Sequence, residues 1–109
     1  MTPVMRRRFD AAGALEDSHG EYPDLVRAVA QETKAPLIDH HRESARVLRE
    51  HGPDGSIALF LQLKAGENPN YPNGIADNTH FSPRGAELMA AEVAKALRAG
   101  GLALAGYLR

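Results

Sequence analysis

The sequence predicts an α/β fold with about two short parallel strands and three to four helices. Residues 2–5 and 36–39 are short apolar segments of the kind found at the ends of buried strands. Apolar residues at helical spacing follow each of them, most clearly over residues 83–97. The resulting order is strand, helix, strand, helix, loop and helix, and this alternation is typical of layered α/β structures.

The first half of the chain divides into a loop and two helices. Residues 10–20 contain glycine and small polar residues and are expected to form a loop. A helix is predicted to begin at Pro23, a favoured first helical residue, and to continue to Lys34. A second helix is predicted over residues 41–51, because Gly52 and the proline after it would stop it.

The second half of the chain contains one ambiguous segment and one clear helix. Residues 57–63 fit either a helix or a strand, and we favour a helix. Residues 64–78 are rich in proline, glycine and asparagine and are expected to form a loop with several turns. Ser82 is a good N-cap and Pro83 a good first residue for the last helix, which Gly100 is expected to end.

Length and composition limit the classes of function. The chain has 109 residues, no cysteine and a formal net charge of −1, so neither a disulfide framework nor thiol chemistry is predicted. This charge gives no electrostatic reason to expect a nucleic acid or a membrane as partner. No apolar segment approaches the length of a membrane span or a secretory signal, so the chain as given is expected to be cytoplasmic.

The residues most informative about chemistry are Asp77 and His80, which directly precede the last predicted helix. A turn over three residues can place the carboxylate against Nδ1 of the imidazole and fix the tautomer of the ring. Nε2 is then free to take a proton from a nucleophile and to return it to a leaving group. These are the roles of the acid and the base in a Ser-His-Asp triad.

The block Asp-x-Thr-His-x-Ser-Pro-x-Gly-Ala, which begins at Asp77, resembles the last conserved block of SGNH (GDSL-like) hydrolases, in the form found in rhamnogalacturonan acetylesterases. The resemblance implies a flavodoxin-like three-layer α/β/α fold and removal of acetyl groups from pectic sugars, with Asp77 as the acid and His80 as the base. It implies neither a metal nor an organic cofactor. Further segments that resemble this family are Thr2-Pro3-Val4, Arg7-Arg8-Phe9, His19-Gly20-Glu21-Tyr22-Pro23, Pro36-Leu37-Ile38-Asp39 and Pro69-Asn70-Tyr71-Pro72.

The chain departs from the family in its nucleophile. The Gly-Asp-Ser block that carries the serine has no counterpart here, nor do the later glycine and the Gly-x-Asn-Asp block that supply oxyanion donors. Ser18 follows an aspartate but has no strand before it and no glycine beside it. We therefore expect residues 1–109 to form a single partial SGNH domain, its C-terminal half, with no nucleophile of its own. Because the nucleophile and the oxyanion donors are missing, we expect the chain alone to be inactive. Two short strands also make a poor sheet, so we expect the isolated chain to be marginally stable or to self-associate.

Other polar residues have simpler interpretations. Asp39 ends a predicted strand, where ligands gather in α/β folds, but helix capping is the better expectation. Asp39, His41 and His51 lack a zinc-site spacing, and the adjacent His40 is expected to point elsewhere, so no metal site is predicted. Ser18, Ser44, Ser56 and Ser82 are expected to be capping or surface residues.

An arginine cluster and a loop tyrosine are two further candidates for binding a ligand. Arg6, Arg7 and Arg8 suit phosphate or an acidic polysaccharide, but a solvated charge cluster is the commoner outcome. Tyr71 suits contact with a sugar ring, although packing of its own loop is the commoner role. The residues that bind substrate therefore stay unknown at this stage.

Three functions are consistent with the sequence. The first is a segment of a serine ester hydrolase, whose intact parent would act on an acetylated carbohydrate or another small ester. The second is a non-catalytic remnant that acts, if at all, by association. The third, favoured least, is a small metal-binding or sugar-binding module that uses the histidines and the loop aromatics.

Overall fold

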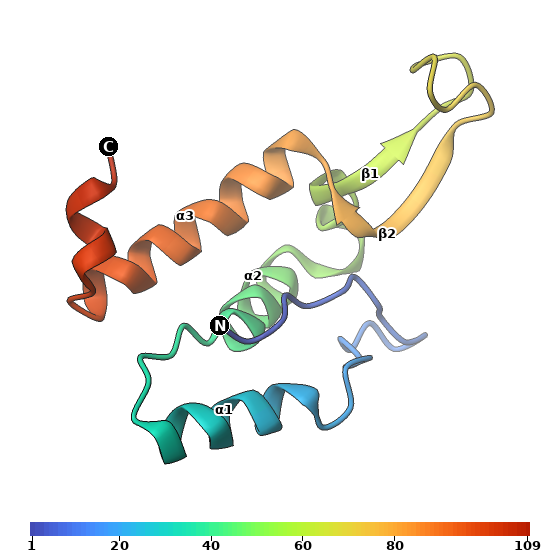
Figure 1. Cartoon of the computed structure of the whole chain (residues 1–109). Coiled ribbons are helices and arrows are strands. Elements are labelled where there is room, and N and C mark those ends of the chain that lie inside the picture. Colours follow the sequence, from blue (N-terminus) through green and yellow to red (C-terminus); the bar gives the residue numbers. More distant parts are fainter.

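The computed structural model describes all 109 residues and contains three α-helices and one pair of strands. The elements in chain order are α1 (Tyr22–Thr33), α2 (His40–Gly55), β1 (Phe60–Leu63), β2 (Ile75–Phe81) and α3 (Pro83–Ala99), with short 3₁₀ turns at Ile57–Leu59 and Ala103–Tyr107. Figure 1 shows that α2 and α3 lie next to each other, with the strand pair beyond one end of α3. The mixed α/β class and the helix number are confirmed.

The predicted ends of α3 are confirmed by its capping contacts. The side chain of Ser82 accepts a hydrogen bond from the Gly85 amide at 3.2 Å, and Pro83 occupies the first turn, where its missing N–H costs nothing. Arg98 lies in the last turn, where its positive charge complements the helix dipole. Gly100 is the C-cap, as expected.

The predicted helix over residues 41–51 corresponds to the regular part of α2. The Asp39 side chain caps it by accepting from the Arg42 amide at 3.3 Å. Gly52, with φ 71° and ψ 179°, interrupts the helical backbone where the sequence placed the stop. One further helical turn follows this kink, up to Gly55.

The two predicted parallel strands are a correction. Residues 2–5 and 36–39 do lie near each other, but a single backbone hydrogen bond, from the Thr2 amide to the Ile38 carbonyl at 3.1 Å, connects them. The Thr2 hydroxyl instead donates to Asp39 and accepts from the His41 amide, at 3.1 and 2.8 Å. One bond does not make a ladder, so neither segment forms a strand.

The strands that do form are antiparallel and come from segments that the sequence assigned to a helix and a loop. Residues 57–59 are helical but β1 follows at Phe60, so the predicted helix over 57–63 is wrong in its second part. The predicted loop over 64–78 is wrong from Ile75, where β2 begins. Burial of Leu59 and Phe60 fixes the end of the helical turn and the start of β1. The turns over residues 64–74 then fold the chain back, so that β2 can pair with β1.

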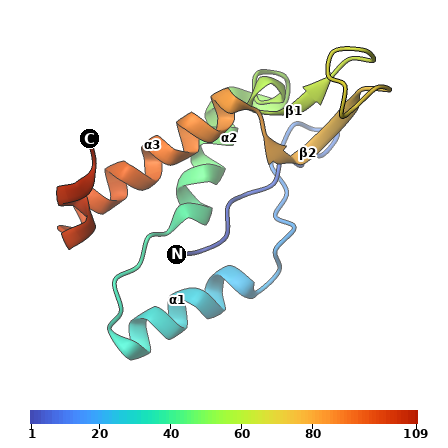
Figure 2. The same cartoon turned by 45° about the horizontal axis from the view of Figure 1, so that its top comes forward.

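The core is small and lies between α2, α3 and the N-terminal segment. Its buried apolar residues are Met5, Ala45, Val47, Leu48, Leu59, Phe60 and Met89. By contrast α1 presents Tyr22, Leu25 and Val29 to solvent and lies apart from the other two helices (Figure 2). The radius of gyration is 15.9 Å, whereas a compact domain of this length has about 13 Å.

Candidate active site

The candidate catalytic pair lies in an irregularity of the strand pair. Phe60 pairs with Phe81 and Gln62 pairs with Ala76, so two steps along β1 correspond to five along β2. Residues 77–80, which stand opposite Leu61 alone, leave the ladder as a bulge. Bulges of this kind redirect side chains and recur beside active sites. Here the bulge contains both residues that the sequence singled out.

A turn closed by the Asp77 carboxylate shapes this bulge. Oδ1 of Asp77 accepts from the backbone amides of Thr79 and His80, at 2.6 and 3.0 Å. The other oxygen, Oδ2, lies 2.6 Å from Nδ1 of the His80 ring. The expected contact between the Asp77 carboxylate and Nδ1 of His80 is therefore confirmed.

This contact fixes how the imidazole of His80 can act. An ionised carboxylate only accepts, so Nδ1 carries a proton and Nε2 of the neutral ring keeps its lone pair. The side chain of His80 is 76% exposed, and Nε2 makes no hydrogen bond within the chain. Nε2 is thus free of contacts within the chain, as the sequence predicted, and its use as a base stays a prediction.

The charge on Asp77 is stabilised by the same turn. The His80 amide, the His80 ring and the Thr79 amide all donate to the carboxylate, and together they lower the pKa of Asp77 to about 2. The carboxylate is therefore ionised at any pH at which an esterase works. In this state it can stabilise a positive charge that develops on the His80 ring.

Arg7 anchors the bulge to the rest of the molecule. Its amide donates to the Asn78 carbonyl at 3.0 Å, and its Nη1 donates to the Asn78 side chain at 2.9 Å. Its Nε donates to the buried Ser56 hydroxyl at 3.1 Å. Gln62 adds a bond from Nε2 to the Asp77 carbonyl at 2.9 Å. The expectation of a solvated arginine cluster is thus wrong for Arg7, because tertiary contacts use its guanidinium.

Contacts with residues 58 and 59 explain the glycine and the serine of the Ser-Pro-x-Gly-Ala block. A side-chain carbon on Gly85 would lie 1.9 Å from the Leu59 carbonyl oxygen, so only glycine lets α3 approach the Ile57–Leu59 turn this closely. Ser82 adds two bonds to the same region, from its amide to Leu59 and from its hydroxyl to Ala58. Below the bulge the rings of Phe60 and Phe81 pack at 5.0 Å between centroids.

No serine of the chain completes a triad with His80. Ser44 is buried and donates to the His40 carbonyl, and Ser56 is buried beside Arg7, so the expectation of surface or capping positions is wrong for Ser44 and incomplete for Ser56. Ser82 is the N-cap that the sequence predicted. Ser18 Oγ is shielded from solvent and makes no hydrogen bond.

The other candidate residues have structural partners. Asp39 caps α2, as predicted, and its two carboxylate oxygens accept from Nη2 and Nε of Arg27, each at 2.9 Å. Nδ1 of His51 lies 2.9 Å from the Val47 carbonyl of its own helix. Tyr71 takes part in the turns of the loop between the strands. The structure gives each of these three residues a local role.

The sequence interpretation missed one group of residues. Asp17 and His19, which it assigned to a plain loop, lie against His41 of α2. An aspartate two residues before a histidine does not by itself indicate a metal site. The third residue of the group, His41, lies in a helix and is 22 residues further along the chain than His19.

Two proteins of Bacillus subtilis (strain 168) are similar to nearly the whole chain. The rhamnogalacturonan acetylesterase RhgT is 44% identical over 108 residues, which is 99% of this chain and 47% of that protein. The chain is related to the rhamnogalacturonan acetylesterases. The probable rhamnogalacturonan acetylesterase YesY is 31% identical over 104 residues, or 95% of this chain and 43% of the relative. The resemblance to SGNH-type rhamnogalacturonan acetylesterases that the sequence indicated is thus confirmed.

The chain spans about half the length of the curated relatives it matches, so the similarity concerns only part of each acetylesterase. No family model matches the chain, and no solved structure matches it. None of its helices has both the length and the hydropathy that a membrane crossing requires.

Proposed function

We propose that this chain supplies the acid and the base of a serine ester hydrolase that deacetylates pectic carbohydrate. The observation that carries the proposal is the Asp77–His80 contact of 2.6 Å, in a bulge that leaves Nε2 exposed. The relationship to rhamnogalacturonan acetylesterases supports the same chemistry. Neither a metal nor an organic cofactor enters this proposal.

The chemistry follows from the tautomer of His80. A serine hydroxyl outside this chain would attack the acetyl carbonyl while Nε2 takes its proton. The imidazolium, stabilised by Asp77, would then return the proton to the sugar oxygen as the ester bond breaks. Water would hydrolyse the acetyl-serine by the same route, releasing acetate. The donors that stabilise the oxyanion would also come from outside residues 1–109.

A polar pocket beside the bulge suits the acidic part of such a substrate. It has a volume of about 270 Å³ and no apolar residue in its lining. Asn78 and Thr79 of the bulge contribute to it, and so do Arg6, Arg7 and Arg8. Guanidinium groups bind carboxylates well, so we propose that this pocket accepts a galacturonate carboxylate next to the acetylated sugar. Arg6 is the best candidate, because Arg7 is bonded to Asn78 and Arg8 to Glu16.

Several features support the view that this chemistry needs a larger domain. His80 has no serine partner, the apolar face of α1 is exposed, and the radius of gyration exceeds that of a compact domain. A second segment of a whole acetylesterase would supply the serine and a surface to cover α1. The alternative that the chain is a non-catalytic remnant or association module rests on the same exposed face of α1.

The test compares the chain alone with a chimera in which the uncovered portion of RhgT is joined to it. The chain alone is expected to turn over an activated acetyl ester no faster than an equal concentration of imidazole, because His80 and Asp77 cannot form an acyl-enzyme. The chimera is expected to show saturable turnover that also releases acetate from acetylated rhamnogalacturonan. A chimera that melts cooperatively but has no activity would contradict the proposal and favour the non-catalytic alternative.

A further inference from the structure

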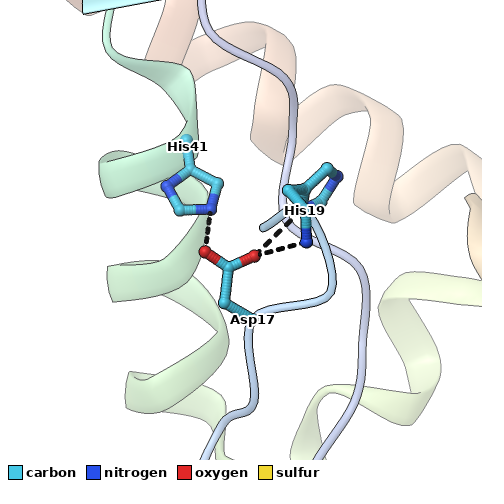
Figure 3. Close-up of side chains that lie close together, drawn as sticks. All are labelled: Asp17, His19 and His41. Carbon is cyan, nitrogen blue, oxygen red and sulfur yellow. Dashed lines mark hydrogen bonds and ion pairs between the residues drawn. The ribbon is translucent and has the colours of Figure 1, made fainter. Parts of the chain in front are cut away.

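The strongest feature outside the candidate active site is a group of one carboxylate and two imidazoles, formed by Asp17, His19 and His41 (Figure 3). Asp17 and His19 belong to the loop between the N-terminal segment and α1, and His41 lies in the first turn of α2. One ligand atom from each residue lies within 4.8 Å of the other two. This group connects the loop to the first turn of α2.

The distances suit a tetrahedral transition metal. Oδ1 of Asp17 lies 3.2 Å from Nδ1 of His19, and Oδ2 lies 3.0 Å from Nε2 of His41. Two ligands of zinc, each about 2.1 Å from the ion and separated by the tetrahedral angle, are about 3.4 Å apart. The three ligand atoms, which lie within 4.8 Å of one another, would close to about this separation around one ion.

The surroundings of His41 supply an independent observation. Its side chain is 13% exposed, and its Nε2 atom is shielded from solvent. The Asp17 carboxylate lies 3.0 Å from Nε2, but the two do not form a well-aligned hydrogen bond. A metal ion between this atom and the Asp17 carboxylate, which are 3.0 Å apart, would give Nε2 a coordination partner. His19 is shielded to the same degree, at 14% exposed, and its ring meets that of His41 edge to face.

The carboxylate is ready to bind a cation. Burial alone would raise the pKa of Asp17, but the His19 amide and the His41 and His19 rings outweigh it, so the pKa lies below its usual value. The His19 amide donates to Oδ1 at 2.8 Å and fixes the orientation of the side chain. Asp17 is therefore ionised and held in place at neutral pH.

Arg27 is the feature that opposes a metal here. Its Nη2 lies 3.3 Å from Nδ1 of His41, which favours a proton on Nε2, the atom that must bind the ion. Metal binding moves this proton to Nδ1 and breaks that one contact. Arg27 keeps its shorter bonds of 2.9 Å to Asp39 and 2.7 Å to Asp24, so it is not left without partners.

We propose that Asp17, His19 and His41 form a binding site for one zinc ion, which fastens the 10–20 loop to the start of α2. Zinc accepts nitrogen and oxygen ligands, and three protein ligands leave the fourth tetrahedral position to water. The proposal revises the sequence-based expectation of no metal, which weighed His41 with Asp39 and His51 and not with the loop. It is independent of the proposed esterase chemistry, since His80 and Asp77 take no part in it.

Titration of Zn²⁺ into the chelator-treated 109-residue chain, followed by calorimetry and metal analysis, tests the site. One equivalent is expected to bind, and the thermal midpoint is expected to rise with the zinc concentration because the ion binds the folded state. His19→Ala and Asp17→Asn are each expected to weaken binding roughly 10-fold or more. Both replace loop residues, so circular dichroism is expected to show an unchanged helix content.

His51→Ala is the matched control, because it removes another histidine of α2 that lies outside the group. It is expected to bind Zn²⁺ as the unmodified chain does. With Co²⁺ in place of Zn²⁺, the visible absorption bands are expected to have the intensity of a four-coordinate site and to disappear in His41→Ala. Absence of stoichiometric binding, or loss of binding in His51→Ala with retention in His19→Ala, would overturn the proposal.

Discussion

The chain contains two turns in which an aspartate holds a histidine, and they differ in what surrounds the ring. In both, a carboxylate oxygen accepts from the backbone amide of the histidine, at 2.8 Å for Asp17–His19 and 3.0 Å for Asp77–His80. In both, the carboxylate also approaches Nδ1 of the ring, at 3.2 and 2.6 Å. The two turns thus share the same pair of contacts, although Asp17 makes both through Oδ1 and Asp77 makes one through each oxygen.

The two turns differ in the tertiary contacts and the exposure of the histidine ring. The side chain of His80 is 76% exposed and Nε2 is free, whereas the side chain of His19 is 14% exposed and packs on His41. An exposed Nε2 suits proton transfer to a group that arrives from another segment or a substrate. A shielded pair of imidazoles around one carboxylate suits an ion. We therefore expect the role of each Asp–His turn to depend on the tertiary contacts of its ring.

The largest expected effect is on kcat, and it tests whether His80 and His19 have different roles. In the chimera with RhgT, His80→Ala is expected to lower kcat roughly 10³-fold or more, because the base is lost. His51→Ala serves as the control and is expected to retain the parent rate, since Nδ1 of His51 lies against the Val47 carbonyl of its own helix. Initial rates on acetylated rhamnogalacturonan measure both. If His19→Ala lowered kcat as far as His80→Ala, the assignment of different roles to the two turns would be wrong.

The second prediction compares the glycines that follow the two turns. Gly85→Ala is expected to destabilise the chain by about 3 kcal/mol, because the new carbon would overlap the Leu59 carbonyl and push α3 away. Gly20→Ala is expected to cost roughly 1 kcal/mol, since its φ of 57° is unfavourable for alanine but no atom lies in the way. Denaturant unfolding measures both. Gly55→Ala, which has room and an ordinary φ, is the control, and a Gly85→Ala variant as stable as this control would contradict the packing argument.

The third prediction concerns pH and has the smallest effect. Because the pKa of Asp77 is lowered to about 2, the carboxylate contributes stability that is complete above its unfolded value of about 4. This contribution is lost as the pH falls toward 2. Carboxyl NMR titration is expected to give a midpoint near 2 for Asp77, and Asp77→Asn is expected to destabilise the chain more at pH 7 than at pH 2. A midpoint at the usual value for aspartate would remove the basis for the ionised pair.

The sequence by itself determined the features that depend on neighbouring residues. The caps of α2 and α3, the stop at Gly52 and the Asp77–His80 contact all involve residues within four positions of each other, so side-chain chemistry and spacing were sufficient. The resemblance to rhamnogalacturonan acetylesterases rests on the same local block, and the relationship to RhgT agrees with it.

The tertiary structure decided the features that join distant segments. The antiparallel pairing of β1 with β2 could not be read from residues 75–81, because that segment is polar and its pairing depends on Phe60 and Gln62. The use of Arg7 to hold Asn78 and the meeting of Asp17 with His41 span 71 and 24 positions of the chain. Such contacts form only when burial of the core brings the segments together, and no local spacing encodes them. This is the physical reason that the sequence indicated the candidate catalytic pair but did not bring Asp17 and His19 together with His41.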